Sequence, residues 1–223
     1  MKTSLSPAAL AAIAALLTSL GCATAPSPQA TPRPGDRSTE LERLEALYTA
    51  REDSARMSIS EADVRFMTGM IHHHAQALVM SALAPTNGAS PTVRTLTSRI
   101  INAQTDEIAV MQRWLRERGR AVPEVGPEGR VTGDHMHMAG MLSTEQLQVL
   151  TAARGPEYDR LFLTYMIQHH EGAVAMVHEL FATDGAAQDA FVFKLASDIQ
   201  VDQRTEVARM RRMLDALPPN HFE

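Results

Sequence analysis

The sequence MIHHHAQALVM places three consecutive histidines between two methionines, in a stretch whose other residues are typical of an apolar helix. One helix face, about 120° wide at 3.6 residues per turn, carries four of these nitrogen and sulfur donors: Met70, His73, His74 and Met80. His72 points to the opposite side of this helix, and we expect it to be exposed. The spacing therefore gathers paired imidazoles and two thioethers on one side of a single helix.

The donor pattern occurs twice in the chain. Two gapless alignments define the repeat: residues 63–80 on 159–176, and residues 100–115 on 199–214. The second copy repeats all four donors: Met166, His169, His170 and Met176. The partner segments repeat a carboxylate and a thioether: Glu107 with Met111, and Glu206 with Met210. The position of His72 holds Gln168 in the second copy, which separates His72 from the repeated set.

Two adjacent histidines on the buried side of a helix need partners away from water, because burying an unpaired polar group is costly. Imidazole binds copper, zinc, nickel and iron, whereas thioether sulfur selects Cu(I). We therefore interpret the paired histidines as metal ligands, with Glu107 and Glu206 holding a histidine ring by a hydrogen bond; direct ligation by these glutamates is the alternative. Two other interpretations stay open. The methionines can be core filling, and the histidines can form a duplicated hydrogen-bond network with Glu and Gln.

A second group of soft donors lies between the repeats, in the Gly- and Pro-containing residues 119–142. Its members form a short string: His135, Met136, His137 and Met138. Such a string can wrap a low-coordinate soft cation, or it can be an ordinary polar loop that contains methionines. Methionine makes up 13 of the 223 residues, and this richness favours copper, as Cu(I), over another transition metal.

Several functional classes are disfavoured by the composition. The formal net charge of −5 and the pI near 6.0 leave no basic excess for a nucleic acid. A di-iron site wants about four inward carboxylates and Glu-x-x-His motifs, and no such motif stands at the core positions. The sequence contains no Gly-x-Ser-x-Gly motif, which disfavours a serine hydrolase. We therefore expect a metal-binding protein without turnover rather than an enzyme.

The N-terminus predicts export. Residues 1–21 combine one lysine with an apolar run too short to span a bilayer, which is typical of a signal peptide. The run ends at SLGC, which resembles the bacterial lipoprotein box, and Cys22 is the only cysteine. We expect Cys22 to be lipidated, with plain secretion after residues 23–25 as the alternative. The mature protein is then a periplasmic or outer-envelope lipoprotein that contacts the membrane through its lipid and offers no thiolate to a metal.

The elements that position the donors are predicted to be helices. Residues 22–37 hold four prolines and form a tether, and residues 38–223 form an all-α domain that begins with an extra N-terminal helix. The domain divides into repeat one at about 60–118, the Met/His linker at 119–142 and repeat two at about 143–217. Each repeat reads as helix, loop, helix, which predicts an antiparallel four-helix bundle. Ser60 with Asp63, and Ser143 with Gln146, are expected helix caps.

The doubled pattern, FMTGMIHHHAQALVM with QTDEIAVM and FLTYMIQHHEGAVAM with QRTEVARM, resembles the bacterial family called domain of unknown function 305. The resemblance covers about residues 60–215 and implies a ferritin-like helical bundle, often exported, in a family that includes periplasmic copper-binding proteins. It implies metal ligands at the eight repeated His and Met positions named above. Ala75-Gln76 departs from the family, which prefers Gln or Glu followed by Gly, as in Glu171-Gly172.

The sequence thus predicts an exported protein that binds copper, as Cu(I) or Cu(II), and buffers or hands on the ion. We expect protons to compete with the metal as the pH falls toward the ordinary histidine pKa of about 6.5. A copper-trafficking protein and a second copy of the chain are compatible partners. Two alternatives remain: a ferritin-like metalloenzyme of the oxidase type, and a helical interaction module whose histidines are structural.

Overall fold

The structure, a computed structural model, describes residues 34–57, 59–126 and 138–218. These residues form six helices and no β-strand: α1 (Pro34–Met57), α2 (Glu61–Ala82), α3 (Pro91–Glu117), α4 (Thr144–Ala152), α5 (Gly155–Ala182) and α6 (Ala190–Asp215). The predicted all-α fold is confirmed. Within these parts of the chain, no helix is both long and apolar enough to cross a membrane.

The predicted N-terminal helix is present as α1. Its apolar side chains are between 55 and 66% exposed: Leu41, Leu44, Leu47 and Tyr48. The chain divides into two compact units, residues 1–46 and 47–223, and α1 crosses the division. The four helices that carry the repeated donors all belong to the second unit.

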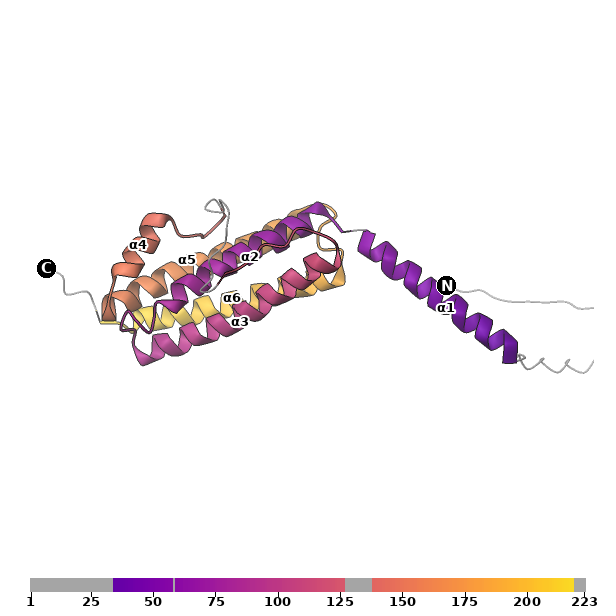
Figure 1. Cartoon of the computed structure of the whole chain (residues 1–223). Coiled ribbons are helices and arrows are strands. Elements are labelled where there is room, and N and C mark those ends of the chain that lie inside the picture. Colours follow the sequence, from indigo (N-terminus) through magenta and orange to yellow (C-terminus); the bar gives the residue numbers. More distant parts are fainter. Residues whose placement is uncertain (1–33, 58, 127–137, 219–223) are drawn as a thin grey trace, which may run out of the picture. The chain divides into compact units, whose positions relative to one another are not determined.

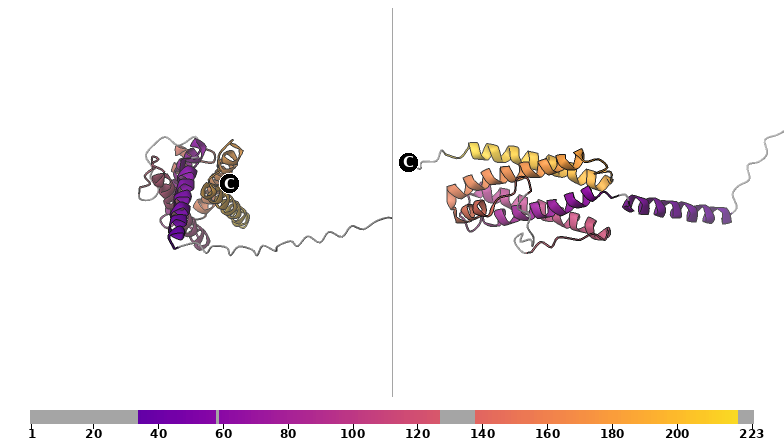
Figure 2. Two further views of the ribbon diagram at one scale, coloured as in Figure 1. Left: turned by 90° about the vertical axis from the view of Figure 1, so that its right-hand side faces the viewer. Right: turned by 90° about the horizontal axis from the view of Figure 1, so that it is seen from above.

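Four helices form the predicted bundle from two hairpins (Figure 1). α2 packs on α3, α5 packs on α6, and the two hairpins meet along α2 and α5 (Figure 2). The hydroxyl of Tyr158, at the start of α5, donates to the carbonyl oxygen of Met80, at the end of α2, over 3.0 Å. α2 and α5 therefore run antiparallel, which brings the middle of each helix, where the histidines stand, to the same level.

The repeated aspartates tie the two hairpins together at both ends of this contact. Asp63 accepts a hydrogen bond from the backbone N–H of Ala187, in the other hairpin, at 2.7 Å. Asp159, its counterpart, accepts from the backbone N–H of Ser90 at 3.1 and 3.2 Å. Each aspartate satisfies a backbone donor of the opposite hairpin's loop. The recurrence of this residue thus follows from a pseudo-twofold relation between the hairpins.

Both predicted helix caps are confirmed, but the second one caps a separate helix. Ser60 and Asp63 form a capping box on α2. Ser143 and Gln146 form another on α4, which ends after one short run. Ala153 is extended and Gly155 has a φ of 57°, so the chain turns before α5 begins. The hairpin helix of repeat two therefore starts at Gly155.

His72 contradicts the prediction that it is exposed, since only 5% of it is accessible. The residues that follow α3 fold back along the outer side of α2, and His72 lines a cavity together with Arg120 to Glu124. The side-chain amide of Gln112 holds this segment by donating to the carbonyl oxygen of Pro123 at 2.9 Å. A helical wheel could not anticipate this cover because it comes from a later part of the chain.

The end of the linker crosses the groove between α2 and α5. Gln76 clamps it, because its side-chain amide donates to the carbonyl oxygen of Leu142 at 3.1 Å and accepts from the N–H of Leu142 at 2.8 Å. Gly172 makes room for it, since a Cβ there would lie 2.0 Å from the carbonyl oxygen of Ala139. Gln76 and Gly172 are the same position of the two repeats. Repeat one therefore has Gln76 where the family prefers glycine, and this glutamine anchors the linker.

Candidate metal centre

The two repeats bring their histidines together in the middle of the bundle. His73 on α2 and His169 on α5 are fully buried, and their ring centroids lie 3.8 Å apart with 39° between the ring planes. The neighbouring rings of His74 and His170 are also fully buried and lie 6.5 and 6.2 Å, respectively, from the first two. We call these four residues the histidine layer.

Two of the four rings are oriented by glutamates of the partner helices. Nε2 of His74 donates to Glu107 at 2.6 Å, and Nε2 of His170 donates to Glu206 at 2.7 Å. These carboxylates are 18 and 25% exposed, so each links a buried ring to the surface of the bundle. A ring that donates from Nε2 carries its lone pair on Nδ1, which is the nitrogen that a metal can use. The predicted hydrogen bonds from glutamate to histidine are present.

The other two rings lie under the linker. Nε2 of His73 donates to the carbonyl oxygen of Ala139 at 3.1 Å, which leaves the lone pair of this ring on Nδ1. Both ring nitrogens of His169 are buried and lack a partner in good hydrogen-bond geometry, and the backbone of His73 lies close enough to act on the pKa of this ring. Nδ1 of His73, of His74 and of His170 also lacks a partner among the described residues. Buried polar atoms usually find a partner, so the concentration of unpartnered ring nitrogens in this layer is unusual.

Burial keeps the central pair uncharged. The pKa of His73 falls from 6.5 to about 3, first because the ring is buried and then because the His74 ring is close. The pKa of His169 falls well below its ordinary value, first through burial and then through His73 and His170. The expectation that protons compete near pH 6.5 is therefore wrong for these two rings, because desolvation disfavours the charged form.

Asp202 on α6 joins the two carboxylates, and sequence reasoning missed it. Its pKa is raised, first by partial burial and then by the negative charges of Glu107 and Glu206. Asp202 stands one helical turn before Glu206, so helical spacing could have found it. Three carboxylates thus gather on the α3 and α6 side of the histidine layer.

The candidate methionines divide into two related sets. The buried apolar side chains of the bundle form two clusters, and each cluster contains one set: Met70, Met111 and Met176 in the first, and Met80, Met166 and Met210 in the second. Each set combines two residues of one repeat with one of the other. All six except Met176 are fully buried. Along both α2 and α5, the histidines stand between the residues of one cluster and those of the other. Thioether sulfur therefore flanks the histidine layer on both sides.

The polar atoms of the layer fit a soft, low-coordinate ion. Each ring of the layer has an unpartnered nitrogen, and thioethers stand in the adjoining turns, which is the donor set that Cu(I) prefers. Gln104 and Gln203 are also buried with unpartnered side-chain oxygens. In the part of the chain that the structure describes, no three His, Cys, Asp or Glu side chains are placed to hold one metal ion together.

The remaining predicted donors are distributed differently. Cys22, His135, Met136 and His137 lie outside the described residues. Met138 is described, and it lies against Gly69 and Met176 rather than in the histidine layer. Sequence reasoning missed the carbonyl oxygen of Ala139, because a backbone acceptor in a loop leaves no sequence signal.

Comparison with known proteins gives the family. The family profile described as Domain of unknown function (DUF305) matches residues 63–214, the range that holds both histidine pairs. The chain belongs to the DUF305 family. A comparison with curated protein sequences gave no match.

Solved structures resemble this DUF305 chain over most of their length. A DUF305 fragment from Deinococcus radiodurans is 31% identical with a TM-score of 0.61, covering 71% of this chain and 99% of its own. CopM in the Cu(I)-bound form is 27% identical with a TM-score of 0.53, covering 69 and 95%. CopM in the Cu(II)-bound form is 28% identical with a TM-score of 0.55 and the same coverage. A secreted DUF305 protein from Streptomyces coelicolor, 24% identical with a TM-score of 0.59 and coverage of 73 and 98%, shares the fold.

Proposed function

We propose that this DUF305 bundle binds copper as Cu(I) in its histidine layer and buffers or hands on the ion without turnover. The ligands are ring nitrogens of the layer, with thioether sulfur from the fully buried methionines that flank it, a group that leaves out the half-buried Met176. Met70 and Met166 stand on the same helix faces as the histidines, one turn away. Cu(II) and other transition metals that accept imidazole are the next candidates.

One observation carries this proposal: four fully buried histidines from both repeats meet, and each has a ring nitrogen without a hydrogen bond. A structural hydrogen-bond network would use these atoms, because an unpartnered buried polar group costs about 1–3 kcal/mol. A metal ion would use them without first displacing a proton from His73 or His169, since both are neutral. The 3.8 Å between the central rings favours one shared centre over two separate ones.

The glutamates support the same centre. A carboxylate that accepts from Nε2 of a metal-binding histidine fixes the ring and raises the basicity of Nδ1. Glu107 and Glu206 occupy this position in both repeats. We assign them to orienting the rings rather than to ligating the ion.

The comparisons support copper as the ion. CopM, which has the same fold, is known in Cu(I)-bound and Cu(II)-bound forms. We extend copper binding from CopM to this chain on the chemistry of the layer. We also propose that the chain is exported and anchored through lipidated Cys22, on the strength of residues 1–21 and the sequence SLGC.

Titration of the purified chain with Cu(I) against a competing chelator tests this function. We expect tight binding in the unaltered chain and its loss when His73, His74, His169 and His170 are all replaced by alanine. His178→Ala is the matched control, because it removes an exposed histidine of α5. Equal binding by the quadruple variant would contradict the proposal and favour structural histidines. Oxygen consumption with repeated turnover would favour a metalloenzyme.

A further inference from the structure

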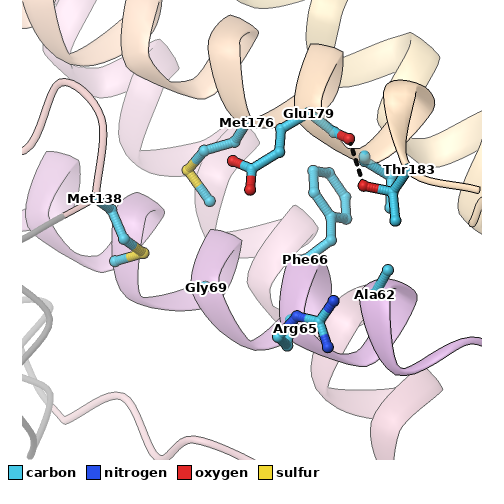
Figure 3. A pocket seen from close by; sticks show the side chains of 9 residues that line it. Ala62, Arg65, Phe66, Gly69, Met138, Met176, Glu179 and Thr183 are labelled. Carbon is cyan, nitrogen blue, oxygen red and sulfur yellow. Dashed lines mark hydrogen bonds between the residues drawn. The ribbon is translucent and has the colours of Figure 1, made fainter.

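A second group of soft donors lies at the surface between α2, α5 and the linker. A cavity of about 200 Å³ opens there, and its lining includes Phe66, Gly69, Met138, Met176 and Glu179. Figure 3 shows the side chains of Met138, from the linker, and of Met176, from α5, on the same side of the helix that carries Gly69. No histidine of the histidine layer lines this cavity, so the cavity is separate from the layer.

Gly69 leaves room for both methionine side chains over the backbone of α2. A Cβ built on Gly69 would lie 3.3 Å from the sulfur of Met138 and 3.3 Å from the methyl carbon of Met176. Both side chains therefore touch the same bare patch of helix backbone. Any larger residue at position 69 would hold them apart or push one of them away.

The place related to this cavity by the pseudo-twofold axis has a different packing. Tyr165 is the counterpart of Gly69, and Met80 is the counterpart of Met176. Tyr165 packs against the apolar cluster in which Met80 is fully buried. Met176 is only half-buried and lines the cavity instead. Core filling explains Met80, but it does not explain a pair of methionines, Met138 and Met176, that share a solvent-accessible opening.

The linker holds Met138 in place by contacts of its own. Ala139, the next residue, accepts the hydrogen bond from His73, and Gly140 packs against Gly172 with φ of 78°. The backbone that follows Met138 is thus held against both α2 and α5. An ion held by Met138 would be one residue away from the backbone that contacts His73.

The donor types specify the ligand. Two thioethers select a soft monovalent cation, Cu(I) or Ag(I), and give little affinity for zinc, magnesium or calcium. The exposed carboxylate of Glu179 lies beside Met176, where it can offset the positive charge of the ion (Figure 3). Arg65, the cation on the same rim, lies apart from both sulfur atoms in this view.

We propose that Met138 and Met176 form a second metal site, which captures a soft monovalent cation at the surface beside the linker. The site goes beyond the proposed function, because it shares no residue with the histidine layer. It binds its ion whether or not the layer does.

Methyl NMR of the full chain labelled at the methionine methyl groups tests this site, with Ag(I) as the probe because it is redox-stable. Met138→Leu and Met176→Leu assign the two signals and conserve side-chain volume. We expect both signals to shift on the same titration curve and the bound Ag(I) to fall by one equivalent in either variant. Met213→Leu, at a half-buried methionine packed on the second apolar cluster, is the control and should leave the stoichiometry unchanged.

The same spectra keep the two sites apart. Shifts at Met70 and Met166 report an ion in the histidine layer, whereas shifts at Met138 and Met176 report the surface site. Signals of Met138 and Met176 that stay in place while Ag(I) binds elsewhere would overturn the second site only. Unchanged stoichiometry in Met138→Leu and Met176→Leu would overturn it as well.

Discussion

The imidazole rings of His73 and His169 meet with 3.8 Å between their centroids, at the centre of a bundle that exposes neither ring. Burial disfavours the charged form of each ring, and neighbouring histidine rings disfavour it further, so the pKa of each ring is lowered. Both rings are therefore neutral bases held in contact. A proton and a metal ion would bind to the same ring nitrogens.

Acid should destabilise the chain through His73 and His169. Their folded-state pKa values lie below the ordinary 6.5, so the unfolded chain binds more protons below pH 6.5. The stability from the neutral rings is complete above pH 6.5 and is lost as the pH falls toward about 3. Each ring contributes a slope of about 1.4 kcal/mol per pH unit. Urea unfolding at a series of pH values measures this slope, and His169→Gln should reduce it; an equal slope in that variant would count against the assignment.

Removing the charge of Glu107 should weaken metal binding without removing a proposed ligand. Glu107→Gln loses the carboxylate that accepts from Nε2 of His74 at 2.6 Å. Loss of such an orienting partner typically lowers metal affinity by about 10- to 100-fold. Cu(I) competition titration measures the change, and Asp106→Asn, at the adjacent exposed carboxylate of α3, is the control. A similar loss in both variants would indicate a general charge effect.

Gln76→Ala should release the linker from α2. It leaves the buried N–H and carbonyl groups of Leu142 without partners, and each such group costs about 1–3 kcal/mol. We expect a lower free energy of unfolding and faster hydrogen exchange at Leu142. Gln148→Ala, at an exposed residue of α4, should change neither quantity. Full protection of Leu142 in the Gln76 variant would show that other contacts hold the linker.

Replacing Cys22 should release the protein from the membrane. This residue lies outside the described part of the chain, and its lipidation rests on the sequence SLGC. We expect the unaltered protein in the membrane fraction, with a mass increased by acyl groups on Cys22. Cys22→Ser should abolish the added mass. Ser27→Ala, in the tether, should keep it, and an unmodified Cys22 in the mature protein would favour plain secretion.

The repeat could be read from the sequence because helical periodicity places side chains on faces without knowledge of their partners. His73 and His74 share a face with Met70, and α2 buries that face as expected. Asp63 and Asp159 recur because both hairpins need the same tie at the same level. Such local and repeated features carry their own signal.

Contacts from distant parts of the chain had no such signal. His72 lies on the outer side of α2 as the wheel requires, yet the residues after α3 cover it. Gln76 looked like a departure from the family pattern, and it holds the linker. The pairing of Met138 with Met176 depends on Gly69, which no periodicity connects to either residue.

The sequence by itself therefore determined the helices, the two hairpins and the four histidines that face the interior, because these follow from local spacing and its repetition. Only the tertiary structure decided that His73 meets His169, that Ala139 contacts His73, and that Met138 and Met176 line the same cavity. These relations depend on the antiparallel packing of α2 on α5 and on the path of the linker. Both are set by long-range packing, in which the chain buries its apolar faces and satisfies its backbone polar groups together.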